Sequence, residues 1–178
     1  MTLKFLLSKV GGSGEICKIV DDGGINERER MFRGSTQLNL DSKGRLAIPA
    51  KYRDELLGKC DGHIVVTADP SRCLVIYPQP VWAPIEAQLN KMFSLNEQVR
   101  RLQRLVIGNA CEVEMDSSGR ILIGPYLRQF AGLQKEVVLA GLGEKFELWD
   151  MEKWNQENEA ATEFIEGEIP SELQGFSL

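Results

Sequence analysis

Apolar and polar residues alternate in two stretches of the chain, and the two stretches match each other at an offset of 75 residues. The apolar positions of the first stretch are Leu38, Leu40, Leu46 and Ile48, and those of the second are Val113, Met115, Ile121 and Ile123. Each stretch contains a short polar segment, Asp-Ser-Lys-Gly-Arg at 41–45 and Asp-Ser-Ser-Gly-Arg at 116–120. Alternation with a period of two around a glycine-containing loop predicts a β-hairpin in each half of the chain.

The two predicted loops share their chemistry. Gly44 and Gly119 can adopt the positive φ that a tight loop requires. Asp41 and Asp116 can accept hydrogen bonds from loop amides and so shape the loops. Hairpin geometry does not require the arginine that closes each segment, which makes that arginine the candidate for a function.

Matching elements continue after each hairpin. Pro49 and Pro125 each preset a helical φ and predict a short helix. We expect Gly58 to end the first of these helices. The side chains expected to face inward are Tyr52, Leu56 and Leu57 in the first helix and Leu127, Phe130 and Ala131 in the second. Strands expected at 64–67 and 73–77 match 137–139 and 146–149 at an offset of 72, as Trp82 matches Trp154.

The repeat divides the chain into five segments. We expect a leader at 1–30 that is disordered or precedes the native start at Met31, repeat 1 at 35–82, a helical connector at 83–110, repeat 2 at 111–154 and an acidic tail at 155–178. A helix is predicted over 81–92, and a capping box at 94–97 opens a second helix. The second helix places Leu95, Val99, Leu102 and Val106 on one face. Its residues Arg100, Arg101 and Arg104 either form a solvated charged face or contact DNA or another subunit.

Composition limits the class of protein. A chain of 178 residues that is 43% hydrophobic can bury a core, and it contains no apolar run of the roughly 20 residues that span a membrane. The four cysteines form no CxxC pair, which favours reduced thiols in a cytoplasm. The net charge is −5, but residues 31–143 hold 14 basic and 11 acidic side chains, and residues 144–178 hold two basic and ten acidic ones. A mildly basic body can meet a phosphate backbone despite the acidic end.

Enzyme sites are not indicated. Two Asp-Ser-x-Gly loops are similar to the paired aspartates of an acid protease, but those need glycine directly after the Ser or Thr, and an arginine nearby favours the ionised carboxylate. His63 and Cys60 could suggest a thiol nucleophile or a zinc ligand, but no second pair of ligands is spaced to complete a site. No glycine-rich loop leads from a strand into a helix with a following Lys-Ser/Thr, so no nucleotide site is indicated. We expect no metal or other cofactor.

The two copies of strand, Asp-x-x-Gly-Arg, strand, proline and helix resemble the swapped-hairpin fold of AbrB and SpoVT-type DNA-binding domains. Residues 31–57, the segment around 100–110 and residues 114–150 resemble the MraZ family of bacterial transcriptional regulators. The resemblance covers residues 31–178. It implies an α+β, β-rich fold in which two tandem repeats form one pseudo-twofold unit with connecting helices.

The resemblance also implies a function. Members of this family bind repeated double-stranded DNA sites upstream of the division and cell-wall gene cluster that begins with their own gene, and mainly repress it. They form ring-shaped homo-oligomers and associate with the nucleoid in the cytoplasm. The resemblance implies no catalysis, small-molecule substrate or membrane.

The residues expected to bind DNA are, in order, Arg45 and Lys43, then Arg120, with Arg33 and Lys51 as backbone contacts. An arginine at a hairpin tip can bond two acceptors of a phosphate or a guanine. The second loop has Ser118 where the first has Lys43, so we expect the first loop to contact DNA more directly. Two alternatives remain open. Each arginine could only hold its loop through an internal salt bridge with Asp41 or Asp116, or assembly could be the main role of the protein.

Overall fold

The structure is a computed structural model that describes residues 31–92 and 95–165; the expected leader and the end of the acidic tail lie outside them. The described chain is α+β, as expected, with eight strands and five helices. The strands are β1 Phe32–Asn39, β2 Arg45–Ala47, β3 His63–Ala68, β4 Leu74–Pro78, β5 Cys111–Glu114, β6 Arg120–Leu122, β7 Glu136–Gly143 and β8 Lys145–Asp150. The helices are α1 Ala50–Cys60, α2 Gln79–Lys91, α3 Glu97–Val106, α4 Pro125–Ala131 and α5 Met151–Ile165.

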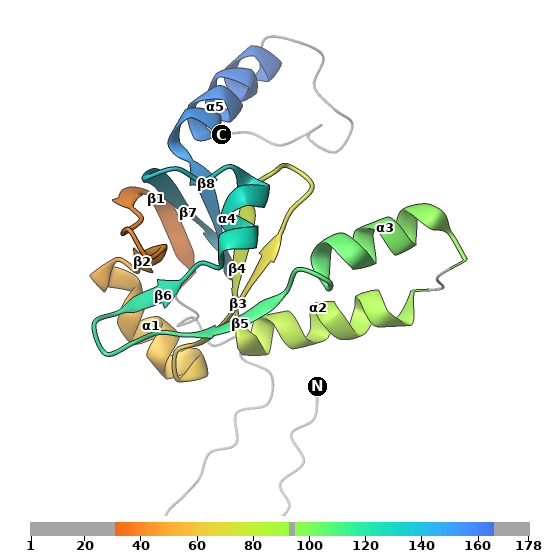
Figure 1. Cartoon of the computed structure of the whole chain (residues 1–178), viewed down its shortest axis with the longest axis horizontal. Coiled ribbons are helices and arrows are strands. Elements are labelled where there is room, and N and C mark those ends of the chain that lie inside the picture. Colours follow the sequence, from red (N-terminus) through yellow and green to blue (C-terminus); the bar gives the residue numbers. More distant parts are fainter. Residues whose placement is uncertain (1–30, 93–94, 166–178) are drawn as a thin grey trace, which may run out of the picture.

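The strands form two antiparallel layers (Figure 1). Six strands make a sheet in the order β1-β7-β8-β4-β3-β5, and β2 pairs with β6 in a separate two-stranded ribbon. The first strand of each repeat pairs inside the other repeat, because β1 lies against β7 and β5 lies against β3. The two repeats are therefore interlocked, and each completes the sheet of the other.

A pseudo-twofold axis relates the repeats, and two residue pairs locate it. In the ribbon, Leu46 pairs with Ile121, its own counterpart at an offset of 75. In the sheet, Val75 pairs with Glu147, its own counterpart at an offset of 72. A residue that faces its own counterpart in an antiparallel pair lies beside a twofold axis, so the axis passes through the middle of both layers.

The two predicted hairpins form only at their loops. In the first, Leu40 and Leu46 make a single isolated bridge, after which the two arms separate into different layers. The reason lies in the exchange of strands, since β1 pairs along its whole length with β7, from Phe32 opposite Gly143 to Asn39 opposite Glu136. The long register with the other repeat replaces the local pairing that alternation predicts.

The offset of 72 expected for the later strands holds between β4 and β8. Between β3 and β7 the offset is 73, so the expectation is wrong there by one residue. Ile76 and Leu148 are counterparts at 72, but their partners across the sheet are Val66 and Leu139, which lie 73 apart. Between these equivalent pairs, the chain from β7 to β8 is thus one residue shorter than the chain from β3 to β4.

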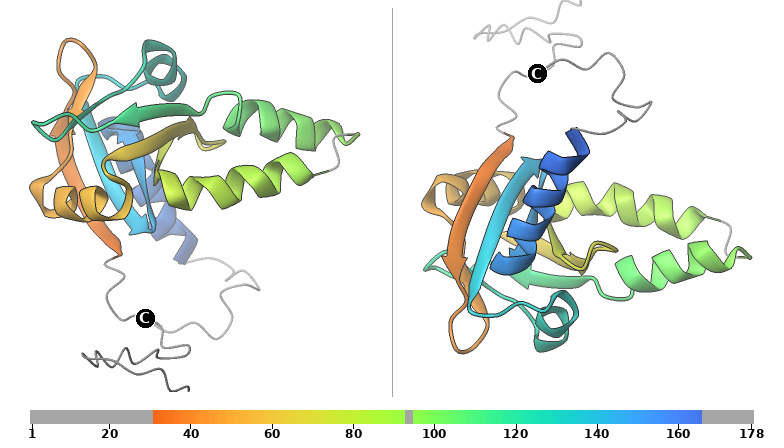
Figure 2. Two further views of the ribbon diagram at one scale, coloured as in Figure 1. Left: turned by 90° about the horizontal axis from the view of Figure 1, so that it is seen from below. Right: turned by 90° about the horizontal axis from the view of Figure 1, so that it is seen from above.

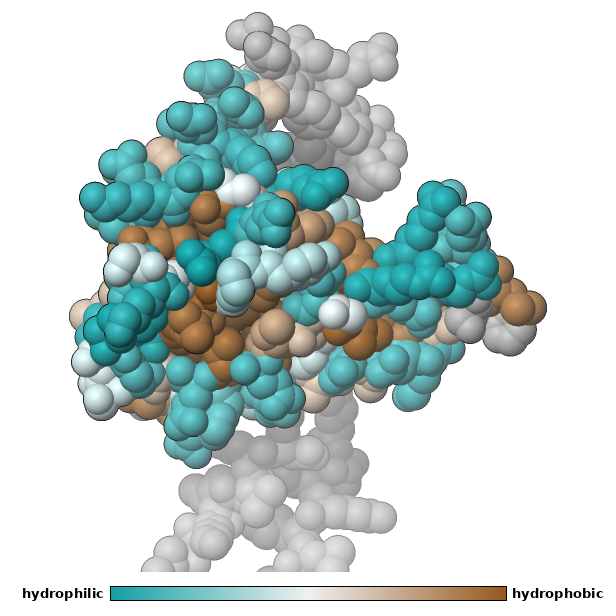
Figure 3. Space-filling view, viewed as in Figure 1, coloured by the Kyte–Doolittle hydropathy of each residue, from teal (hydrophilic) through white to brown (hydrophobic). Residues whose placement is uncertain are grey.

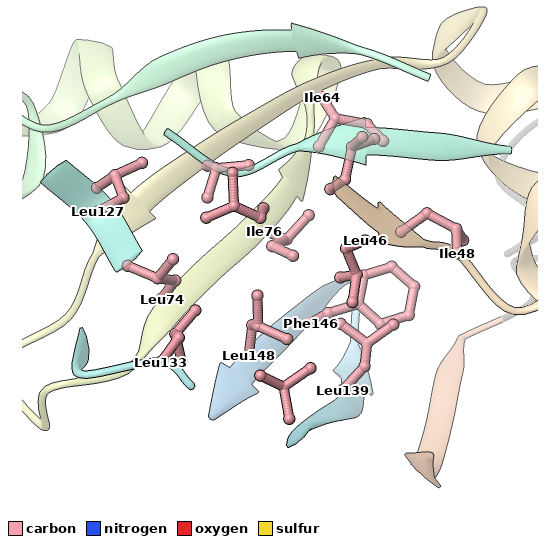
Figure 4. Packing of buried hydrophobic residues seen from close by; sticks show 14 of the residues in the cluster. Leu46, Ile48, Ile64, Leu74, Ile76, Leu127, Leu133, Leu139, Phe146 and Leu148 are labelled. Carbon is pink, nitrogen blue, oxygen red and sulfur yellow. The ribbon is translucent and has the colours of Figure 1, made fainter. Parts of the chain in front are cut away.

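The core lies between the sheet and the ribbon (Figure 4). Leu46 and Ile48 point from the ribbon segment toward Phe146, Leu148 and Leu139 of the sheet, and all five are fully buried. Aromatic contacts add to this core, where the rings of Phe32 of β1 and Phe146 of β8, both in the six-stranded sheet, stack with centroids 4.1 Å apart. Tyr52 meets Phe146 edge to face at 5.0 Å.

Helix α1 corrects two expectations. Tyr52 and Leu56 are buried as predicted, but Leu57 is 48% exposed. Because successive helical residues differ by about 100° in direction, Leu57 cannot share the inner face that Tyr52 and Leu56 occupy four residues apart. The helix also continues through Gly58 to Cys60 and ends at Asp61, which adopts a left-handed conformation. In α4, Leu127 and Ala131 are buried and Phe130 is half-buried, as predicted.

Helices α2 and α3 project sideways from the layered body as a helical arm (Figures 1 and 2). Helix α3 starts at Glu97, and its first turn is capped by the side chain of Asn96, which accepts a hydrogen bond from the amide of Gln98; the predicted cap residue Ser94 lies outside the described residues. The predicted apolar face does not reach the core, since Leu95 is 74% exposed and Leu102 is 36% exposed. Most of the arm is hydrophilic in Figure 3, and hydrophobic side chains gather at its tip.

Candidate nucleic-acid interface

The ribbon of β2 and β6 has one buried face and one exposed face. Leu46 and Ile121 are fully buried against the sheet, and side chains alternate along a strand. Alternation therefore places their neighbours on the outer face: Arg45 and Ala47 from β2, and Arg120 and Leu122 from β6. Across the ribbon Arg45 is paired with Leu122, and Arg120 with Ala47. The pseudo-twofold axis thus sets two arginines, one from each repeat, on a single exposed face.

The first loop is built around the carboxylate of Asp41. One oxygen, Oδ1, accepts hydrogen bonds from the amides of Lys43 and Arg45, each at 2.9 Å. The other, Oδ2, lies 2.6 Å from Nε of Arg45. These contacts, with that from the Arg45 amide foremost, lower the pKa of Asp41 to about 2. The ion pair holds the arginine side chain at the base of the loop, and that side chain stays 34% exposed.

The second loop has the same construction. Asp116 accepts hydrogen bonds from the amides of Ser118 and Arg120 at 2.9 Å. Its other oxygen receives both Nε of Arg120 at 2.9 Å and Nη2 at 2.8 Å. The side-chain contact with Arg120 is the main cause that lowers the pKa of Asp116, and the same contact raises the pKa of Arg120. Arg120 contacts its aspartate through Nε and Nη2, whereas Arg45 contacts its aspartate through Nε.

Each loop is also held by an arginine from the other repeat. The Arg128 guanidinium of α4 packs over Gly44, and that of Arg53 in α1 packs over Gly119. Arg53 donates from Nε to the carbonyl of Ile48 at 2.7 Å. Both loop glycines have a positive φ, +82° and +75°. Neither arginine was predicted as part of the site, although Arg53 and Arg128 are 75 residues apart, the same offset that relates the two loops.

The remaining candidate residues are not all brought together. Lys43 is exposed within the first loop. Arg33 lies on β1, eight residues before Asp41, which corresponds to roughly 26 Å along a strand. Lys51 lies in the first turn of α1, with Nζ 4.6 Å from the centroid of the Tyr52 ring. The Tyr52 hydroxyl donates to the carbonyl of Arg33 at 2.6 Å, so Arg33 and Lys51 both lie next to Tyr52 and apart from the first loop.

The residues considered for catalysis or metal binding do not form a site. His63 is exposed on β3 opposite Glu114, and burial raises the pKa of the Cys60 thiol, which disfavours a reactive thiolate. Within residues 31–92 and 95–165, no group of three or more His, Cys, Asp or Glu side chains could hold a metal ion. No helix of this described part is long and apolar enough to cross a membrane.

Two interlocked repeats with a central ribbon define the class of swapped-hairpin proteins. The family model described as "MraZ protein, putative antitoxin-like" matches the chain twice, over residues 31–105 and 106–169. The chain therefore belongs to the MraZ family, a family of transcriptional regulators and not of enzymes.

Relatives named "Transcriptional regulator MraZ" are similar over most of the chain. The proteins of Nitrosomonas europaea and Nitrosospira multiformis are 75% and 65% identical over 148 residues, which is 83% of this chain and 100% of each relative. The protein of Methylobacillus flagellatus is 49% identical over the same shares.

Proposed function

We propose that this protein is a sequence-specific regulator that binds double-stranded DNA through the outer face of the ribbon. The observation that carries the proposal is the placement of Arg45 and Arg120 on one exposed face of a two-stranded antiparallel ribbon. A two-stranded ribbon fits the major groove of B-DNA, where base edges are distinguishable. Arginine bonds the two acceptors of guanine there, and it also binds phosphates.

The ion pairs within the loops support a role for Arg45 and Arg120 as preoriented DNA contacts. Asp41 fixes the direction of Arg45 before DNA arrives, so less side-chain entropy is lost on binding. Arginine has five N–H donors, and the contact with Asp41 is made by Nε. The alternative hypothesis, that each arginine only shapes its loop, is consistent with the same contacts. It does not explain why both arginines stay about one-third exposed on the same face.

The first loop makes the stronger contact in this proposal. Lys43 adds a positive charge where the second loop has Ser118, and Arg45 is engaged by its aspartate through fewer nitrogens than Arg120. Arg33 and Lys51 lie apart from the first loop and serve as backbone contacts only if the DNA extends along α1.

We infer the biological setting from the resemblance to the family. The DNA would be repeated sites upstream of the gene cluster for division and cell-wall synthesis that contains the protein's own gene. The main effect is repression, and the protein acts at the nucleoid in the cytoplasm. A single ribbon makes few contacts, so a ring of identical copies would gain affinity by engaging several sites at once. The exposed apolar side chains of the helical arm, such as Leu95, suit contacts between copies.

The test is a gel-shift titration of the full chain on DNA from upstream of its own gene, with light scattering on the same samples. Arg45→Ala is expected to weaken binding by roughly 5- to 150-fold, the cost of one good base contact, without a change in particle size.

The matched control is Lys145→Ala, because the Lys145 side chain is also 34% exposed and forms an ion pair with a nearby acidic residue, Glu147, but lies on β8 of the sheet. Binding by the Arg45 variant equal to that of the unchanged protein would refute the assignment of the ribbon. It would favour the alternative that assembly is the main role.

A further inference from the structure

The outer face of the ribbon also exposes a large apolar side chain. Leu122 of β6 is 53% exposed, although its neighbours Ile121 and Ile123 are almost completely buried. Alternation along the strand fixes this outward direction and would suit a polar residue equally well. Leu122 therefore adds little to the core of the chain, and its apolar surface is available to a ligand that covers the ribbon.

The position of Leu122 relates it to the arginine of the first loop. Leu122 is the residue directly paired with Arg45 across the ribbon. Side chains in such a pair have Cβ atoms about 4.5–5.5 Å apart, which is between one and two times the roughly 3.4 Å between successive bases of a DNA strand. Two side chains at this separation can contact neighbouring base pairs.

We propose that Leu122 determines part of the DNA sequence preference by packing against the C5 methyl group of a thymine. This thymine lies next to the base contacted by Arg45. The inference rests on the proposed function, since it requires the ribbon to enter the major groove. Thymine is the only DNA base that presents a methyl group there, and apolar side chains recognise it by contact. Removal of both apolar surfaces from water stabilises the complex.

The pseudo-twofold counterpart of Leu122 differs from it. Ala47 occupies the equivalent place 75 residues earlier and is paired with Arg120. The shorter side chain cannot reach as far from the ribbon as leucine does. The end of the ribbon that carries Arg45 and Leu122 thus reads a different base step from the end that carries Arg120 and Ala47, and the protein binds its site in one orientation.

The experiment compares two versions of one DNA fragment from upstream of the gene, prepared with thymine or with uracil, which lacks only the methyl group. The unchanged full chain is expected to bind the uracil fragment about fourfold more weakly, the effect of one lost methyl contact. Leu122→Ala should bind the thymine fragment about fourfold more weakly and lose nothing more on uracil DNA. Leu142→Ala is the matched control, because Leu142 is 49% exposed on β7, away from the ribbon.

The possible results separate this inference from the function on which it rests. If the change from thymine to uracil weakens binding of Leu122→Ala as much as it weakens binding of the unchanged protein, the contact is refuted. The contact is also refuted if the unchanged protein binds the two fragments equally. DNA binding that still depends on Arg45 would then leave the proposed function intact. If the unchanged protein binds neither fragment, the proposed function fails, and the role of Leu122 fails with it.

Discussion

The guanidinium of Arg128 packs so closely on Gly44 that a Cβ placed on this glycine would lie 2.7 Å from Cζ of the arginine. The contact crosses between the repeats, since Arg128 belongs to the second repeat and Gly44 to the first loop. The amide of Ile123 donates to the carbonyl of the same glycine at 2.9 Å. Each loop that carries a candidate DNA-binding arginine is therefore shaped by the other half of the molecule.

Gly44→Ala should destabilise the protein and weaken DNA binding. An alanine at a φ of +82° is strained and would also displace Arg128, at a cost of about 1–3 kcal/mol. Urea unfolding of the purified variant measures this cost, and a gel shift measures the effect on the loop.

Gly58→Ala provides the control for that variant. Gly58 lies within α1, and a Cβ added there meets nothing within 4 Å, so the substitution should stabilise the protein by about 0.5–1 kcal/mol. If the two variants unfold at the same urea concentration, the contact with Arg128 does not constrain the loop.

Asp41→Asn should make folding less sensitive to acid. The pKa of Asp41 is lowered from 3.8 to about 2, so its contribution to stability is complete above pH 4 and is lost as the pH falls toward 2. Asparagine cannot ionise, and the variant should lack this part of the decline. Denaturant unfolding between pH 5 and pH 2 checks the prediction, with Asp54→Asn, exposed on α1, as the control. Parallel pH curves for the variant and the unchanged protein would contradict it.

Neither half of the molecule should form a folded monomer. Strand β1 has its partner β7 in the second half, and β5 has its partner β3 in the first. Fragments 31–92 and 95–165, produced separately, are each expected to be unfolded or to pair with a second copy that replaces the missing half. Circular dichroism with sedimentation checks this, and mixing the two fragments should restore a one-to-one complex. A fragment that unfolds cooperatively as a monomer would disprove the interlocking.

The sequence allowed the repeats, the α+β class and most of the inward side chains of α1 and α4 to be predicted, because periodicity and a duplicated motif are local signals. The alternation alone did not reveal that β1 leaves its hairpin for β7, since exchange between two similar halves conserves the same alternation; the exchange was implied only by the resemblance to the swapped-hairpin fold. The contacts of Arg53 and Arg128 with the opposite loops were missed for the same reason. Pairing across the pseudo-twofold axis is a property of the assembled fold, and for these two arginines the shared offset of 75 residues was the signal in the sequence.

The charge difference between the loops should be visible in the salt dependence of DNA binding. Each phosphate that a lysine or arginine neutralises adds about 0.9 to the slope of log affinity against log salt concentration. Lys43→Ser gives the first loop the residue that the second has at Ser118, and it should lower the slope by about one while it weakens binding to all sequences alike. Ser118→Lys makes the opposite exchange in the second loop and should raise the slope if that loop also lies near a phosphate. Gel shifts at several salt concentrations give both slopes for the same DNA fragment. An unchanged slope for Lys43→Ser would mean that the tip of the first loop does not reach the DNA backbone. Lys43 would then not belong to the interface, and the role of Arg45 would still be decided by the Arg45→Ala experiment.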